Sequence, residues 1–198
     1  MNSNSTLDEI ALDTEPLVAP SATHSPWQID PAASRVEFTI GKRLLFVKRL
    51  VVTGRFSDVS GNIMLDEQDP TTAQASIRIG AASIDSGNAR RDKHLRNADF
   101  FDVEKHPTLN FRSLRVDALD QPAGRYRVVG NLTVRGVTRE VMLDAHYSQA
   151  QRSGGDRRLM LNLTAPLKRL DFGLTWSKAA IKIDEDLTVS LSIEATRG

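Results

Sequence analysis

The sequence predicts an all-β fold, an antiparallel barrel or sandwich of about eight strands with one short helical segment. Along most of the chain, apolar and polar residues alternate with a period of two, as expected for strands with one buried face. Clusters of glycine, proline and aspartate separate these stretches. Parallel α/β strands would instead form continuous apolar runs, because both of their faces are covered. The length of 198 residues suits a single domain.

Residues 1–26 are predicted to form a flexible tail, and residues 27–198 to form the folded domain. The tail is rich in Ser, Asn and Thr and shows no clear hydrophobic period. Such a composition buries too little apolar area to offset the entropy of ordering. A few apolar residues in the tail could still dock on the domain or pack across a neighbour in a homodimer: Ile10, Leu12, Leu17 and Val18.

Each predicted strand contributes a row of residues that should point inward, while the polar residues between them face outward. In chain order, the inward rows are Val36, Phe38 and Ile40; Leu50, Val52, Gly54 and Phe56; Ala73, Ala75, Ile77 and Ile79; Leu109 and Phe111; Tyr126, Val128, Gly130, Leu132 and Val134; Val141, Leu143, Ala145 and Tyr147; Leu159, Leu161 and Leu163; and Leu187, Val189, Leu191 and Ile193. Small members of these rows would leave space unless their neighbours refill it. The pattern therefore allows either a filled barrel or one that holds a small ligand.

One segment, residues 86–97 with the sequence SGNARRDKHLRN, breaks the strand rhythm because it is polar and lacks β-branched residues. Ser86 or Asn88 could cap a short helix there. Leu95 is its only strongly apolar residue, so the helix should lie on the surface or cover one end of the barrel. Turns are expected at Ser60-Gly61, Asp69-Pro70, Pro122–Gly124, Arg135-Gly136 and Ser153–Asp156.

Composition and motifs exclude several classes of protein. The chain has no cysteine, which rules out disulfide frameworks, thiolate metal sites and cysteine nucleophiles. A net charge of +1 argues against a dedicated nucleic-acid binder. The chain lacks the glycine-rich loops that cradle phosphates, and its histidines do not have the spacing of a local metal clip. We therefore expect neither a metal nor a catalytic cofactor.

Targeting signals are also lacking in the sequence. No apolar run approaches the roughly 18–20 residues that span a bilayer. No Lys or Arg precedes Arg35, whereas a secretory signal begins with a basic segment. These observations predict a cytoplasmic protein.

Two charged motifs could carry chemistry or contacts. Asp92 and His94, beside Arg91, could act as a general base on a small apolar substrate, although no nucleophile elbow accompanies them. The alternative is a solvated helix held by ion pairs and capping bonds.

The second motif consists of basic doublets at residues 42–43 and 48–49, which flank the apolar run 44–47. They could contact anionic lipid headgroups transiently, or they could be ordinary exposed charges on a strand pair.

Several motifs, in the same order along the chain, resemble the YceI-like family of lipocalin-like, polyisoprenoid-binding proteins over about residues 27–195. The motifs are WQIDP at 27–31, SRVEF at 34–38, ASIDSGN at 82–88, RDKHL at 91–95, PTLNFRS at 107–113, GNLTVRGVT at 130–138 and RLDFG at 169–173. This chain departs from the family pattern at Lys42, where the family usually has His, and at residues 183–187.

The resemblance implies an extended lipocalin-like antiparallel β-barrel. Its tunnel would hold a long-chain isoprenoid, such as an isoprenoid quinone, or a fatty lipid, as cargo rather than as a reacting substrate. We expect Phe38, Phe56, Phe111, Leu132 and Leu143 to line this tunnel, and Phe100, Phe101 and Trp176 to line or close an end. Arg91, Asp92 and His94 match the family motif, as a headgroup contact or as a network that holds the helix to the barrel. Two other functions stay open, an enzyme that uses Asp92 and His94 and a filled barrel that acts as an interaction or stress-response protein.

Overall fold

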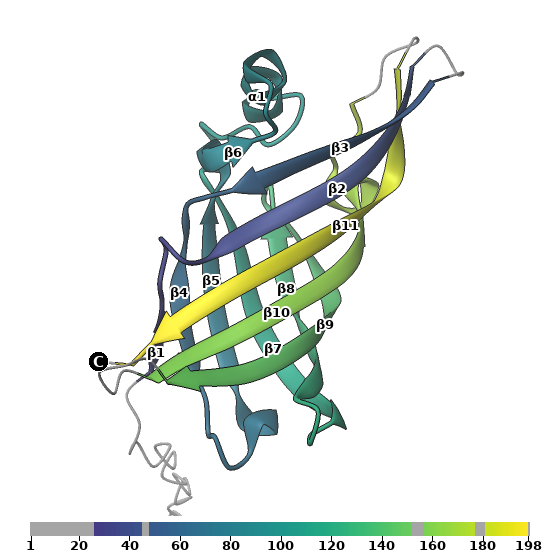
Figure 1. Ribbon diagram of the computed structural model, residues 1–198. Coiled ribbons are helices and arrows are strands. Elements are labelled where there is room, and N and C mark those ends of the chain that lie inside the picture. The colour runs from purple at the N-terminus through teal and green to yellow at the C-terminus, as the bar shows by residue number, and fades with distance from the viewer. Residues whose placement is uncertain (1–25, 45–47, 152–156, 177–180, 198) are drawn as a thin grey trace, which may run out of the picture.

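The computed structural model describes residues 26–44, 48–151, 157–176 and 181–197, which form an antiparallel β-barrel with one helix in the described part (Figure 1). The helix α1 is Ala89–Arg96, and short 3-10 turns lie at Pro70–Thr72, Ala81–Ser83 and Arg169–Phe172. The strands are β1 Trp27–Ile29, β2 Arg35–Leu44, β3 Lys48–Phe56, β4 Val59–Met64, β5 Gln74–Gly80, β6 Ile84–Asp85, β7 Thr108–Asp120, β8 Arg125–Val134, β9 Val137–Gln151, β10 Arg157–Lys168 and β11 Ile181–Thr196. The predicted all-β class is therefore confirmed.

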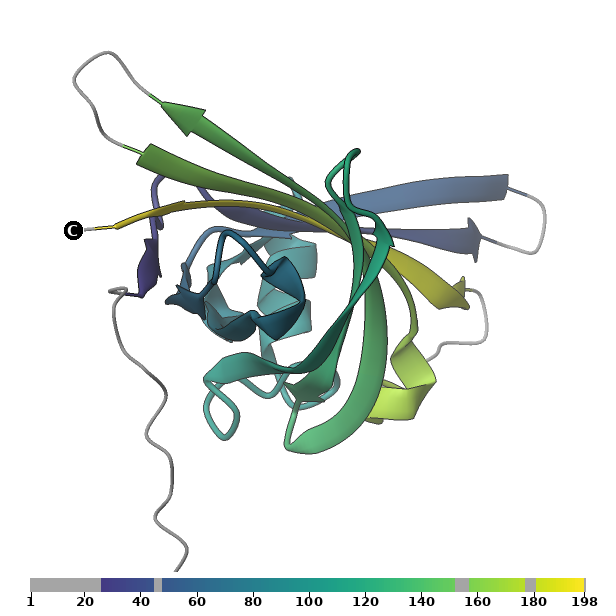
Figure 2. The ribbon, with the colours of Figure 1, turned by 90° about the horizontal axis from the view of Figure 1, so that it is seen from below.

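The strands close into a ring, which is seen from below in Figure 2. In the order of pairing the ring is β1-β4-β5-β7-β8-β9-β10-β11, and β1 closes it by pairing with β11. This confirms the barrel of about eight strands. A sandwich, which the pattern also allowed, is wrong because the sheet has no break between two layers.

Three strands of the barrel are each interrupted by a short bend, giving the consecutive pairs β1 and β2, β3 and β4, and β5 and β6. In the lower half of Figure 1, the pieces β1, β4 and β5 complete the ring. In the upper half, β2 and β3 continue from β11, and β6 pairs with β3 but, within the described residues, with no other strand. The barrel therefore opens between β6 and β7, at the end where α1 lies.

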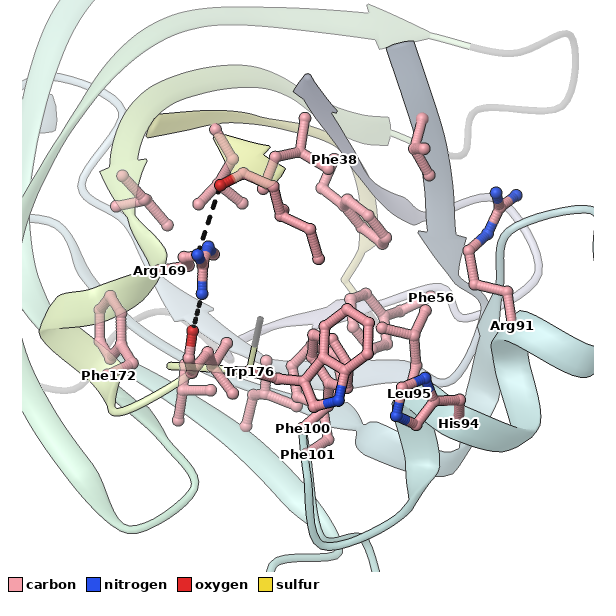
Figure 3. A pocket seen from close by; sticks show the side chains of 18 of the residues that line it. Phe38, Phe56, Arg91, His94, Leu95, Phe100, Phe101, Arg169, Phe172 and Trp176 are labelled. Carbon is pink, nitrogen blue, oxygen red and sulfur yellow. Dashed lines mark hydrogen bonds between the residues drawn. The ribbon is translucent and has the colours of Figure 1, made fainter. Parts of the chain in front are cut away.

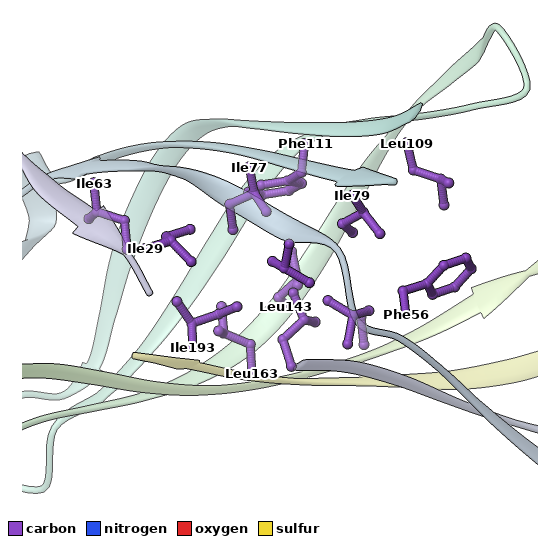
Figure 4. Packing of buried hydrophobic residues seen from close by; sticks show 14 of the residues in the cluster. Ile29, Phe56, Ile63, Ile77, Ile79, Leu109, Phe111, Leu143, Leu163 and Ile193 are labelled. Carbon is purple, nitrogen blue, oxygen red and sulfur yellow. The ribbon is translucent and has the colours of Figure 1, made fainter. Parts of the chain in front are cut away.

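A cluster of buried apolar residues extends along the barrel interior (Figure 4), and it fills the lower half. Trp27, Leu159 and Ile193 come from three different strands and are at most 2% exposed. Complete burial of a large apolar side chain contributes about 1.5–3 kcal/mol, so this half supplies much of the stability. The remaining void here is only about 70 Å³.

Two inward glycines make room for phenyl rings rather than for a ligand. The ring of Phe38 lies over Gly54, its partner across the β2–β3 pair. The ring of Phe111 covers Gly130 of β8 in the same way. Of the two alternatives that the sequence left open for these small residues, the structure shows the second at both positions, because neighbouring aromatic rings refill the space.

The helix and most of the described turns lie where the sequence predicted them. The Asn88 side chain caps α1 by accepting a 3.0 Å hydrogen bond from the Arg91 N–H. Turns occur at Asp69-Pro70, Pro122–Gly124 and Arg135-Gly136. The turn expected at Ser60-Gly61 is wrong, because both residues belong to β4. Gly61 has a φ of +147° and lies close to the Ser76 carbonyl, so close backbone approach explains this glycine.

Some predictions concern residues outside those that the structure describes. They are the flexible tail, its docking or homodimer contact through residues 10–18, the apolar hairpin tip at 45–47 and the turn at Ser153–Asp156. Among the described segments, none of the helices has the length and apolar character needed to cross a bilayer.

Candidate ligand-binding site

The upper half of the barrel encloses a cavity of about 810 Å³. This volume lies within the ~300–1,000 Å³ range of small-molecule sites. Apolar side chains form most of its wall, and they come from both interrupted and continuous strands. They are Val36, Phe38, Ile40, Val52, Phe56, Ile79, Leu109, Leu132, Val134, Leu167, Ile181, Ile183, Leu187 and Val189 on strands, with Leu95, Phe100, Phe101, Phe172, Leu174 and Trp176 from α1 and the loops. A completely filled barrel is therefore wrong for this chain.

An aromatic cluster forms one wall of the cavity. The rings of Phe38 and Phe56 are 6.1 Å apart between centroids, and Phe101 meets Phe56 edge-on at 5.6 Å. These are ordinary geometries for stabilising aromatic pairs. Phe38 is only half-buried, unlike the lower core, because one side of its ring faces the open cavity. Figure 3 shows the three rings beside this space.

A second aromatic cluster connects α1 to the loop that follows β10. The His94 ring lies edge-on to Trp176 at 4.8 Å and to Phe100 at 5.1 Å. Phe100 and Trp176 are 5.4 Å apart. The structure thus brings these three residues together at one side of the cavity (Figure 3).

Leu132 lines the cavity, but two other residues expected to line a tunnel do not. Phe111 and Leu143 belong to the packed lower core (Figure 4). Phe111 borders only the small void there, since it lies over Gly130. The prediction that Phe111 and Leu143 line a tunnel is therefore wrong, because the cavity occupies only the upper half of the barrel and the lower half is filled. Inward alternation identified their face of the sheet but could not give their height along the barrel axis.

Arg91 and Asp92 are joined through Ser86, at the turn that leads into α1. Asp92 is 6% exposed and accepts hydrogen bonds from the Ser86 N–H, at 2.9 Å, and from the Ser86 hydroxyl. The Arg91 guanidinium donates to the Ser86 hydroxyl at 2.7 Å and to the Ser86 carbonyl at 2.6 Å. This network fixes the start of α1 against the end of β6. It matches the alternative in which Arg91 and Asp92 hold the helix to the barrel.

His94 does not share this network. Its Nε2 lies 3.1 Å from an Asp99 carboxylate oxygen, while Asp92 is occupied by Ser86. The Asp92–His94 pair on which the enzyme alternative depends is therefore not formed. In the described part of the chain, no group of three or more metal-ligating side chains gathers.

The charged side chains that line the cavity are all basic among the described residues: Lys42, Arg90, Arg91, Lys93 and Arg169. Arg169 is the deepest of these, at 8% exposed. It donates to the carbonyls of Asp184 at 3.0 Å, Ile183 at 3.3 Å and Leu174. Burial lowers the pKa of its guanidinium, an effect that Glu185 opposes, but an arginine stays charged.

Sequence reasoning quoted Arg169 only as part of a motif and did not name it as a site residue. The signal that could have singled it out is the apolar setting of RLDFG, in which an arginine directly follows an inward strand row. The upper residues of β11, Ile181 and Ile183, were also missed. Acidic residues follow them before the regular row resumes at Leu187.

The fold and the cavity together define a lipocalin-like barrel, in which an antiparallel ring encloses a largely apolar cavity. The chain belongs to the YceI-like family, since the YceI-like domain matches residues 27–195. It is 32% identical over 195 residues to a UPF0312 protein of Pseudomonas aeruginosa (strain LESB58), with 97% of each chain covered.

The fold is shared with solved structures, including the following two. BcnA of Burkholderia cenocepacia aligns with a TM-score of 0.71 at 21% identity, covering 85% of this chain and 99% of BcnA. A polyisoprenoid binding domain from Saccharophagus degradans, implicated in plant cell wall breakdown, aligns with a TM-score of 0.60 at 17% identity. That comparison covers 87% of this chain and 98% of the domain.

Proposed function

We propose that this protein binds a long-chain isoprenoid, such as a polyprenyl lipid or an isoprenoid quinone, or a similar fatty amphiphile, and carries it without a chemical step. The observation that supports this proposal most is the cavity of about 810 Å³ with its apolar and aromatic wall. The polyisoprenoid binding domain from Saccharophagus degradans, which has the same fold, is consistent with this proposal. The separation of Asp92 from His94 favours binding over catalysis.

Burial of an apolar tail is sufficient to hold such a cargo. About 500 Å² of buried tail at ~25 cal/mol/Å² contributes roughly 12 kcal/mol. Association costs at least about 4 kcal/mol. The remainder corresponds to roughly micromolar affinity, so the site needs neither a metal nor a covalent bond to function.

Exchange of cargo with a membrane would need a surface that approaches lipid. The β2–β3 hairpin extends from the barrel at the cavity end (Figure 1). It carries Arg43, Lys48 and Arg49 as exposed cations, with Lys42 beside the cavity. Basic residues near an anionic lipid surface contribute about 1 kcal/mol each, so this hairpin supports transient contact with a membrane.

Native mass spectrometry of the freshly purified protein, with mass analysis of its organic extract, tests the carrier function. We expect an additional stoichiometric mass that matches a polyprenyl or acyl lipid. A clean ligand-free mass, together with no uptake of quinones or fatty acids on incubation, would refute the carrier function.

A further inference from the structure

Arg169 places a buried positive charge at the wall of an apolar cavity. The register of β11 with β2 shifts between Ile183 and Leu187, which forms a bulge in β11. The Arg169 side chain connects this bulge to the loop after β10 through three carbonyl oxygens. Carbonyls satisfy N–H donors but do not neutralise a guanidinium, and none of the described carboxylates forms a salt bridge with it. A guanidinium has five N–H groups, so two remain beyond the three carbonyl contacts.

Lys42 approaches the same place from the neighbouring strand. It pairs with Ile183 across the β2–β11 ladder, and Ile183 is also one of the residues whose carbonyl accepts from Arg169. Lys42, Arg169 and Ile183 all line the cavity. Lys42 and Arg169 thus come from different elements, and both are neighbours of Ile183. Figure 3 shows Arg169 at the wall opposite Arg91 and His94 of α1.

We infer that Lys42 and Arg169 form a subsite for the negatively charged headgroup of the cargo, either a carboxylate or a phosphate monoester. This inference rests on the proposed carrier function and adds the chemical class of the ligand to it. The headgroup lies beside Ile183, and the tail extends toward Leu132 and the cluster of Phe38, Phe56 and Phe101. A buried cation forms a stronger charge-assisted hydrogen bond than an exposed one, so Arg169 contributes more than Arg90 or Lys93.

Paired ligands with the same tail test the inference. Binding of farnesyl phosphate and farnesol, and of dodecanoate and dodecanol, is measured by calorimetry on the full chain after removal of endogenous lipid. We expect each anion to bind at least tenfold more tightly than its alcohol, and a higher salt concentration to reduce this preference. The pair with the larger ratio of anion affinity to alcohol affinity identifies the headgroup.

Variants locate the effect. Lys42→Met is expected to reduce the anion preference by at least fivefold, while Lys182→Met, its exposed control one residue from Ile183, leaves the preference unchanged. Arg169→Lys tests the second cation, with thermal unfolding to confirm that the barrel still forms. If Arg169→Lys unfolds the chain, the anion preference of Lys42→Met and the salt dependence of wild-type binding decide whether the headgroup subsite exists.

The outcomes separate the inference from the proposed function. Equal binding of anion and alcohol overturns the headgroup subsite and leaves the carrier function intact. A lack of binding by all four amphiphiles overturns both. Inorganic phosphate alone is the remaining probe, and binding of free phosphate as tight as that of farnesyl phosphate would assign the subsite to a free anion instead of a lipid headgroup.

Discussion

Asp92 accepts hydrogen bonds from both the backbone N–H and the hydroxyl of Ser86, six residues before it. The Ser86 hydroxyl in turn accepts from Arg91. A buried carboxylate thus organises the segment between β6 and α1, at the point where the ring of strands opens. This contact explains why Asp92 is buried in a polar helix while Lys93 beside it is exposed and Arg91 is half-buried.

We expect Asp92→Ala to lower the free energy of unfolding by about 2–4 kcal/mol, because it removes two charge-assisted hydrogen bonds and leaves Ser86 unsatisfied. Urea unfolding measures this change. Asp99→Ala is the matched control, since Asp99 forms only a partly exposed pair with His94 and should change stability by less than about 1 kcal/mol. Unchanged stability in Asp92→Ala would contradict the structural role of this carboxylate.

Leu132→Arg should remove bound lipid and leave a folded barrel. The side chain lines the cavity from near the end of β8, where a guanidinium would be buried among apolar side chains. The extract of the purified variant, analysed by mass spectrometry, provides the measurement, with circular dichroism as the folding check. Met142→Arg is the control, because Met142 is 58% exposed on β9. Lipid retained at wild-type stoichiometry in Leu132→Arg would show that this part of the cavity is not the site.

The two glycine–phenylalanine contacts predict different consequences for the same substitution. Gly54→Ala should push the Phe38 ring into the cavity and weaken lipid binding. Gly130→Ala should displace Phe111 within the solid core, at a cost of about 1–3 kcal/mol in stability, and leave lipid affinity unchanged. Calorimetry and thermal unfolding distinguish the two. Equal losses of affinity in both variants would contradict the separation of cavity and core.

Stability should fall in acid partly through Asp85. The Gly87 N–H and then Arg55 lower the pKa of its carboxyl below the ordinary value of 3.8. Because the folded state lowers this pKa, the contribution is complete above that ordinary value and is lost as the pH falls below it. Unfolding of Asp85→Asn should therefore depend less on pH below about pH 4. Glu104→Gln, which alters an exposed carboxyl, serves as the control and should follow the wild type.

Contact with membranes should depend on the basic hairpin. Arg43→Glu combined with Lys48→Glu should reduce sedimentation with vesicles of mixed phosphatidylglycerol and phosphatidylcholine by more than about fivefold. Arg125 is an exposed basic residue at the opposite end of the barrel, so Arg125→Glu is the control and should sediment with vesicles as the wild type does. Sedimentation equal for the hairpin variant and for the wild type would refute membrane contact at this surface.

The period-two pattern was sufficient to predict the inward rows from Val36 to Ile193, because burial on one face of an antiparallel strand enforces alternation. It could not predict β4. Gly61 resembles a turn residue, but it lies within this strand, where the Ser76 carbonyl comes too close to leave room for a side chain. Nor could it show that the first three strands of the barrel are each broken into two pieces. These breaks depend on how distant strands pair.

The candidate site was predicted less completely than the fold. Phe38, Phe56, Leu132 and Trp176 line the cavity, whereas Phe111 does not. Alternation specifies which face a residue takes, but the distance along the barrel axis follows from the stagger of the strands. The place of Arg169 directly after an inward row was a signal of burial, but the carbonyls of Ile183 and Asp184 that accept its hydrogen bonds come from a distant strand and could not be predicted.

The division of the barrel into a solid lower core and a hollow upper chamber has a consequence for how such proteins diversify. Large side chains near Trp27 and Leu159 hold the fold without touching the chamber. Under the proposed function, substitutions around Lys42, Leu132 or Trp176 can therefore alter which ligand binds, because residues outside the cavity supply much of the free energy of folding. Natural variation in cargo among chains of this architecture should accumulate in the upper walls, and the lower residues should change mainly in compensating pairs.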